Sequence, residues 1–141
     1  MKFKYYKLSL PRRSDFFGNA ILKPIIPIAI SVGGQRLDYA ALIDSGADFC
    51  IFHAEIGEYL GLDIRSGKLE SFGGVQAAAR AEAFIHEVSV NVGGWNYKIN
   101  AGFSYDVAKY GYGLLGQKSF FDIFTVKFDL VKEEIELKER S

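Results

Sequence analysis

Residues Ala41 to Asp48 read ALIDSGAD. In this stretch three apolar residues run into an Asp-Ser-Gly turn, which is typical of a buried strand that delivers one carboxylate into a cavity. Gly46 allows the backbone to turn tightly, and the hydroxyl of Ser45 is able to bond nearby backbone groups. The octapeptide therefore predicts that Asp44 is a functional carboxylate held at the end of a strand.

A second segment of this kind follows towards the C-terminus, where residues 112–124 read YGLLGQKSFFDIF. Leu114, Leu115 and Gly116 form an apolar-apolar-Gly element, and the residues after it are typical of a short helix. An ordinary turn aspartate at position 44 leaves this distant element unexplained.

The rest of the chain consists of short apolar or alternating segments separated by paired glycines, a pattern typical of β-hairpins. The clearest alternation, with a period of two, begins at Trp95 and ends at Phe103. Expected strands are Pro24–Val32, Arg36–Ile43, Ser66–Phe72, Val75–Val92, Trp95–Phe103, Thr125–Asp129 and Glu134–Lys138, with turns at Gly33-Gly34, Gly73-Gly74 and Gly93-Gly94. A helix is expected over Ala54–Leu60, capped by Gly61. Short strands with one or two brief helices predict an all-β, barrel-like domain.

The composition fits one folded domain in a chain of 141 residues, 49% of them apolar. We assign residues 24–141 to the domain and residues 1–23, which are basic and aromatic, to an N-terminal arm or extra strand. Lysines and arginines number 17, as do aspartates and glutamates, so no net charge draws the chain to nucleic acid or to a membrane. Peptides or proteins are the expected partners. The single Cys50 forms no internal disulfide, and no apolar signal segment is visible, so we expect a soluble cytoplasmic protein.

Together the two glycine-containing elements resemble those of the retropepsin-like aspartic proteases, over roughly residues 24–137. The resemblance implies an acid-protease barrel in which Asp44 is the catalytic aspartate. It further implies that Ser45 interlocks the loops of two subunits, that Gly46 and Ala47 contact substrate through their backbone, and that Asp48 flanks the same loop. The flap tip corresponds to Phe72, Gly73, Gly74 and Val75, the loop behind the site to Leu114, Leu115 and Gly116, and a helix to Gln117–Phe124.

The chemistry of this class needs two carboxylates that share one proton. One stays protonated and polarises the scissile carbonyl, while the other removes a proton from water; aspartic proteases are the standard example of such a pair. The chain contains a single Asp-Ser-Gly, so a homodimer must supply the second Asp44 across a two-fold axis. The expected mechanism uses neither a metal nor another cofactor.

Two departures from the family pattern bear on the dimer. Viral members follow the glycine of the second element with an arginine that pairs with the acid corresponding to Asp48, whereas this chain has Gln117 and Lys118. A neutral hydrogen bond replaces that pair, or the pair is absent. The 23 N-terminal residues also exceed the terminal strand of viral members, and they either add to an interface or block it.

Alternative interpretations remain open at this stage. The domain is a protease, a catalytically inactive retropepsin-like module for dimerisation or peptide binding, or an unrelated β-barrel binding protein in which Asp44 belongs to an ordinary turn. Asp48 is expected to have a structural role. Gly73-Gly74 forms either a moving flap or a plain hairpin turn.

Other chemistries are poorly supported by the sequence. Ser45 lacks the Gly-x-Ser-x-Gly context of a hydrolase nucleophile. Cys50 stands in an apolar run, where a buried and inert thiol is the usual outcome. His53 is expected near a helix start and His86 on a strand face, and one cysteine with two histidines does not make a zinc site.

Overall fold

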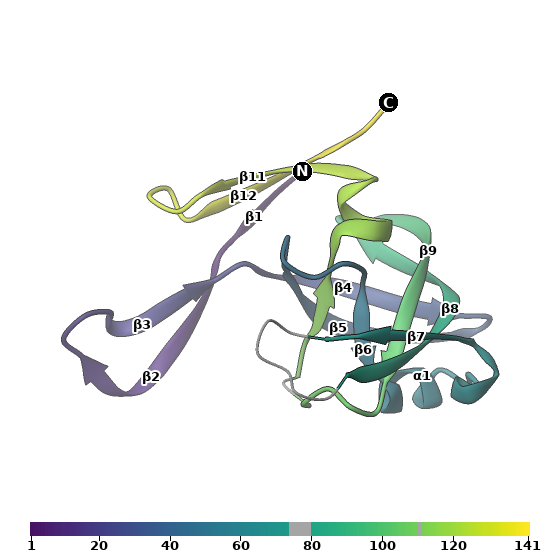
Figure 1. Ribbon diagram of the computed structural model, residues 1–141. Coiled ribbons are helices and arrows are strands. Elements are labelled where there is room, and N and C mark those ends of the chain that lie inside the picture. The colour runs from purple at the N-terminus through teal and green to yellow at the C-terminus, as the bar shows by residue number, and fades with distance from the viewer. Residues whose placement is uncertain (74–79, 110) are drawn as a thin grey trace.

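The computed structural model describes residues 1–73, 80–109 and 111–141. Figure 1 shows three parts: a β-barrel, a small sheet formed by both ends of the chain, and a two-stranded arm that projects to one side. The strands of the barrel region are β4 (Ile25–Val32), β5 (Gln35–Ile43), β6 (Ile51–His53), β7 (Lys68–Phe72), β8 (Ala81–Val92), β9 (Trp95–Ser104) and β10 (Gly113–Leu115).

Six of these strands close into a ring. Their order is β4-β5-β10-β6-β9-β8, and β8 returns to β4 through the pairs Ala29↔Asn91, Ile30↔Val90 and Ser31↔Ser89. Strand β7 adds to β8 outside the ring. Pro27, which has no backbone donor, lies on β4 before the stretch that pairs with β8, as expected for a proline in a strand. The predicted all-β barrel is therefore confirmed.

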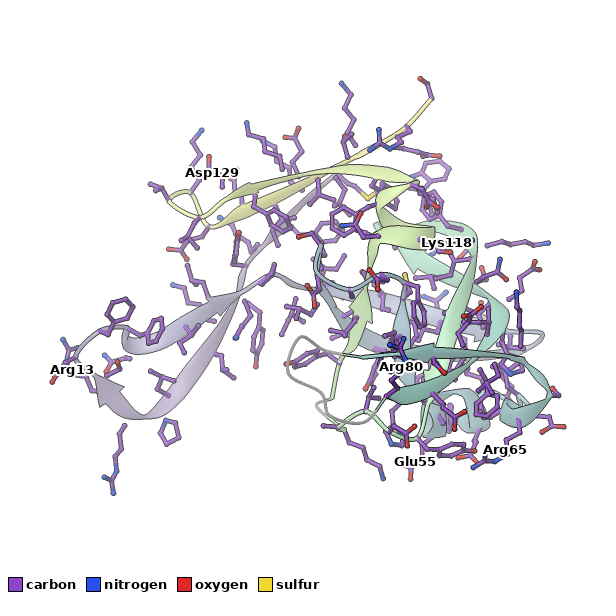
Figure 2. The ribbon with its side chains drawn as sticks, in the orientation of Figure 1. Arg13, Glu55, Arg65, Arg80, Lys118 and Asp129 are labelled. Carbon is purple, nitrogen blue, oxygen red and sulfur yellow. The ribbon has the colours of Figure 1, made fainter. Side chains whose placement is uncertain are left out.

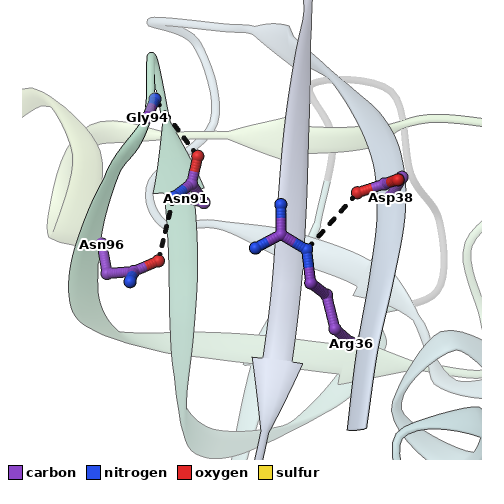
Figure 3. Close-up of polar contacts among 5 residues, drawn as sticks. All are labelled: Arg36, Asp38, Asn91, Gly94 and Asn96. Atoms are coloured by element: carbon purple, nitrogen blue, oxygen red, sulfur yellow. Dashed lines mark hydrogen bonds and ion pairs between the residues drawn. The ribbon is translucent and has the colours of Figure 1, made fainter.

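Two of the predicted glycine hairpins are present as expected. Gly33-Gly34 joins β4 to β5, and Gly93-Gly94 joins β8 to β9. Asn91 fixes the second turn: its side chain accepts a hydrogen bond from the amide of Gly94 at 3.2 Å and donates one to Asn96 at 3.0 Å (Figure 3). The same view shows Arg36 and Asp38, an ion pair on β5 with a separation of 3.6 Å.

The helical segments are short and agree with the predictions only in part. Helix α1 (Ala54–Tyr59) has Leu60 as its C-cap, and the following Gly61 has a φ of +89°, the left-handed conformation expected of the cap. A 3-10 turn, η1 (Ile64–Ser66), follows it. The helix expected over Gln117–Phe124 is wrong in detail: η2 (Gln117–Phe121) is an irregular turn in which Lys118 has an extended backbone and Ser119 a φ of +80°. No helix in the described parts of the chain is long and apolar enough to span a membrane.

Both chain ends meet in a separate three-stranded sheet of order β1-β12-β11. It contains β1 (Lys2–Lys4), β11 (Phe124–Asp129) and β12 (Glu134–Glu139). Ile135 and Leu137 are buried and belong to the same core cluster as Phe120 and Phe124. The remaining described strands, β2 (Tyr6–Ser14) and β3 (Gly18–Lys23), pair with each other in a separate two-stranded sheet and form the arm.

The core of the barrel is aromatic and aliphatic. Phe52 and Phe103 stack at its centre with ring centroids 5.9 Å apart, and neither is exposed. Trp95, at the start of the alternating strand, is by contrast 69% exposed because it lies next to the Gly93-Gly94 turn and beyond the packed layer. The core thus fills the interior of the barrel. The strand ends that carry the polar loops lie at the rim of the barrel.

Candidate active site

Strand β5 places Asp44 at the rim of the barrel. The strand is held on one side by β4 and on the other by β10, and its last residue, Ile43, is buried. The amide of Asp44 donates to the carbonyl of Leu115 at 3.0 Å. Its carboxylate oxygen Oδ1 accepts a hydrogen bond from the amide of Gly46 at 2.9 Å, and its own carbonyl accepts from Ala47 at 3.2 Å. The half-buried Asp44 is therefore fixed by its backbone and by its side chain.

The second glycine element lies directly behind this loop. Strand β10 runs parallel to β5, with Leu115 beside Ile43, and its residue Leu114 pairs with Ile51 of β6. Beyond the strand, the amide of Gln117 donates to the carbonyl of Ala47 at 2.8 Å. The Asp44 loop therefore lies beside Gly116. In an unrelated barrel with an ordinary turn aspartate, Asp44 would be expected far from Gly116.

Two glycines allow the close approach of these segments. A side chain at Gly116 would collide with the backbone carbonyls of Ala47 and Phe49, and one at Gly113 would collide with the ring of Phe52. Both positions are buried. Gly113 was not predicted as a site residue, although the spacing of two glycines around Leu114 and Leu115 was a visible signal.

Gln117 takes part in the loop by a route that the sequence did not predict. Its side-chain amide donates to the backbone carbonyl of Ser45, not to the carboxylate of Asp48. Asp48 is instead held by its backbone, since its carbonyl accepts from the amide of Lys118 at 2.9 Å. A neutral hydrogen bond thus supports the loop where the viral pattern has an arginine–carboxylate pair.

Comparison with known proteins places this geometry in context. No protein-family model and no curated protein matches the sequence. A solved structure of a retropepsin-like aspartic protease from Rickettsia conorii is 19% identical, with 97% of this chain and 91% of that chain covered and a TM-score of 0.55. The retroviral protease-like domain of Ddi1 from Leishmania major is 19% identical, with 82% and 88% covered and a TM-score of 0.56. This chain has a retropepsin-like fold. At such identities the likeness extends to the fold alone.

Two hollows flank the loop in this retropepsin-like fold. One, of about 390 Å³, has mostly apolar walls: Leu42, Ile51, His53, Val107, Ala108, Tyr112 and Leu114. Leu42 lies two residues before Asp44, on the same side of the strand. The other, of about 590 Å³, is lined by Asp48, Phe49, Lys68, Glu70, Ile85, Asn100 and Lys118. Leu42 was not predicted as a site residue, although its strand position relative to Asp44 was sufficient to find it.

An ion pair anchors one wall of the smaller hollow. Lys109 contacts Glu55 of α1 at 2.7 Å, close to Val107 and Ala108 in the sequence. The hydrogen bond from Lys109 lowers the pKa of the Glu55 carboxyl. Both side chains are exposed, so the contact positions the segment more than it stabilises the fold.

The predicted flap falls partly outside the described residues. Phe72 is the last residue of β7, and its ring meets that of Phe49 edge to face at a centroid distance of 5.7 Å. Gly73 follows and is exposed, whereas Gly74 and Val75 are not among the described residues. The base of the segment therefore contacts the loop of Asp44 through two aromatic rings.

The remaining nucleophilic or metal-binding candidates have structural surroundings. Cys50 is fully buried, and burial raises the pKa of its thiol to about 12. His53 caps α1 by accepting a hydrogen bond at Nδ1 from the amide of Glu55, and Nε2 of His86 lies 2.8 Å from the carbonyl of Ile64. Within the described residues, no group of three His, Cys, Asp or Glu side chains is arranged to hold a metal ion.

Proposed function

We propose that this protein is an aspartic endopeptidase that acts as a homodimer, with a water molecule activated between two Asp44 carboxylates. The observation that carries this proposal is the position of Asp44. It follows a buried strand, and its carboxylate accepts a hydrogen bond from the amide of Gly46. Its loop is hydrogen-bonded to the segment Leu114 to Gly116. A carboxylate that is restrained in this way is held in one orientation before substrate arrives, which is what catalysis by positioned groups requires.

The proposed chemistry follows from bringing two such loops together. Like charges a few ångströms apart cannot both ionise easily, so one Asp44 keeps a proton and polarises the peptide carbonyl. The other accepts a proton from the attacking water. In this dimer Ser45 stabilises the contact between the two loops, and the backbone of Gly46 and Ala47 contacts the substrate.

The two hollows support a peptide as the substrate. An extended peptide that crosses the rim has side chains on alternate sides, and hollows of about 390 Å³ and 590 Å³ lie next to the loop of Asp44. The smaller one favours an apolar side chain because Leu42 and Leu114 line it. Phe72 and Gly73 belong to the flap that covers the peptide. The single, buried Cys50 is compatible with the reducing cytoplasm as the place of action.

The decisive experiment compares wild type with Asp44→Asn, and uses Asp48→Asn as the matched control. Both variants remove one carboxylate from the same loop. We expect Asp44→Asn to abolish cleavage of a peptide library at mildly acidic pH, with unchanged circular dichroism and unchanged dimerisation. Asp48→Asn should retain cleavage and change only the preference for side chains that enter the hollow lined by Asp48. Cleavage by highly purified Asp44→Asn at the wild-type rate would refute the catalytic assignment.

The same samples distinguish an inactive module. An inactive retropepsin-like dimerisation or peptide-binding domain cleaves no peptide in either form, and it binds a statine-containing peptide equally well with Asp44 or Asn at position 44. The proposed protease instead binds that transition-state-like peptide much more weakly after the substitution, because the paired carboxylates contact the statine hydroxyl.

A further inference from the structure

The N-terminal arm, Tyr6 to Lys23, is a two-stranded ribbon that no third strand of the described chain extends. Among the described strands, β2 and β3 pair only with each other, and none of the residues from 6 to 23 is buried. Nine residues in β2 correspond to a length of about 30 Å. Figure 2 shows Arg13 at the outer end of the arm, well away from the barrel. An isolated two-stranded hairpin is at best marginally stable in water, so the ribbon needs a surface to pack on.

One face of the arm carries apolar side chains near its root, next to Lys23. The register places Tyr6 opposite Lys23 and Leu8 opposite Ile21 on this face, while Ser9 and Ala20 pair on the other. Tyr6 is 52% exposed and Leu8 42% exposed. At the tip, Phe16 is 87% exposed and Phe17 54% exposed. Exposed apolar side chains therefore lie both near the root and at the tip of the ribbon, which favours docking of both parts on a surface.

The root of the arm is held next to the loop of Asp44. At one end the carbonyl of Pro24 accepts a hydrogen bond from the amide of Ile43 at 2.9 Å. At the other end the amide of Tyr5 donates to the carbonyl of Glu133 at 3.0 Å, and Lys7 forms an ion pair with Glu133 at 3.5 Å. The C-terminal end of the arm is therefore bonded to the residue before Asp44, and the arm points away from the body of its own chain (Figure 1).

Charge identifies the surface that fits the arm. Residues 1–23 contain six lysines or arginines and one aspartate, a net charge of +5, whereas residues 24–141 contain 11 and 16, a net charge of −5. A second copy of the chain thus offers a body of opposite sign, while contact between two arms would juxtapose like charges. A membrane surface would use the two phenylalanines of the tip but would leave the apolar face near Leu8 unpaired.

We propose that the arm of each chain seats on the body of a second copy, so that two arms clasp the dimer reciprocally. The inference relies on the proposed function only for the location of the two-fold axis near Asp44. With both arms rooted beside that axis, each one reaches over the partner's body. The contact is isologous, so every residue that it buries is buried twice.

The test measures dimerisation by sedimentation equilibrium at low and high salt. Leu8→Ser/Ile21→Ser removes the apolar face, Arg12→Glu/Arg13→Glu reverses charge, and Ser9→Thr/Ala20→Ser alters the other face as the matched control. We expect the wild type to be a dimer, and the first pair of substitutions to raise its dissociation constant about tenfold or more. The second pair should also raise the dissociation constant, by a factor that becomes smaller as the salt concentration rises. The control should match wild type, and thermal unfolding checks that each barrel is intact.

A photo-reactive phenylalanine analogue at position 16 maps the contact directly. In a mixture of isotopically light and heavy copies, we expect cross-links between copies that end within residues 24–141. A wild-type monomer, an unchanged dimer with Leu8→Ser/Ile21→Ser, or cross-links confined to one copy or to two arms would overturn the inference. So would a monomer that binds phosphatidylserine vesicles and loses that binding with Phe16→Ser/Phe17→Ser.

The outcomes separate this inference from the proposed function. If the arm variants dissociate the dimer but the wild type cleaves no peptide, the clasp stands and the protease proposal fails. If the wild type is active and the arm variants remain dimeric and active, the protease proposal stands and the inference about the arm fails. If both proposals are correct, the arm variants lose activity at low protein concentration and regain it as the concentration rises.

Discussion

The side-chain amide of Gln117 donates a hydrogen bond to the backbone carbonyl of Ser45, 72 residues earlier in the chain. This bond joins the turn after β10 to the loop that carries Asp44. Because it ends on a carbonyl oxygen, it requires a donor at position 117 and no charge. The candidate site is therefore assembled from two distant segments through a neutral contact.

We expect Gln117→Glu to weaken this loop. A carboxylate of nearly the same shape cannot donate, and it would face the Ser45 carbonyl with a negative charge. The free energy of unfolding should fall by about 1 kcal/mol, and peptide cleavage should fall with it. Urea unfolding measures the first effect. Lys118→Gln, at the exposed neighbouring position, is the control, and equal losses in the two variants would argue against a specific role for Gln117.

Gly116 should tolerate no side chain. The Cβ of Gly116→Ala would collide with the carbonyls of Ala47 and Phe49, which are backbone atoms that cannot rotate away. We expect a loss of about 2–4 kcal/mol in unfolding free energy, or failure to fold. Gly34→Ala is the matched control, because the space around Gly34 is open. Similar unfolding midpoints for the two variants would contradict the packing described for the loop.

Leu114→Ala should change the side-chain preference of the protease. The substitution enlarges the apolar hollow next to Asp44, so the ratio of kcat/KM for peptides with a large aromatic side chain over those with leucine should rise several-fold. Competition between paired peptides in one reaction measures this ratio directly. Ile85→Ala, which enlarges the other hollow, should leave it unchanged. An identical shift in both variants would mean that the two hollows do not act as separate subsites.

The buried thiol of Cys50 should make stability depend on alkaline pH. Burial raises its pKa from 9.0 to about 12, so the unfolded chain loses this proton first as pH rises. Between those values each pH unit costs the folded state about 1.4 kcal/mol through this group. Relative to Cys50→Ala, the wild type should therefore lose stability from pH 9 to pH 11. Urea unfolding under reducing conditions checks this, and parallel curves for the two proteins would refute it.

Local signals in the sequence were sufficient for several elements. The turns at Gly33-Gly34 and Gly93-Gly94 were predicted correctly because a hairpin turn depends on the residues within it. Helix α1 and its cap at Gly61 were predicted for the same reason. The strand that ends at Asp44 was recognisable from three consecutive apolar residues.

The region after Gly116 shows where local signals fail. Its composition and the family resemblance favoured a helix over Gln117–Phe124. In the structure, however, Lys118 pairs its extended backbone with Phe49, and Ser119 takes a positive φ to turn the chain afterwards. Hydrogen bonds to the loop of Asp44 take the place of the hydrogen bonds of the expected helix. No residue within this segment predicts these long-range hydrogen bonds.

The sequence by itself determined the alternation of the strands, their glycine turns, the single Asp-Ser-Gly and the opposite charges of the arm and the domain. Only the tertiary structure decided that β4 closes on β8, that Gly113 and Gly116 leave room for Phe52 and for the Asp44 loop, and that the arm projects away from the barrel. The physical reason is the distance along the chain between the groups that interact. Backbone preferences and turns depend on neighbours in the chain, whereas strand pairing and close packing depend on groups that folding brings together from distant positions.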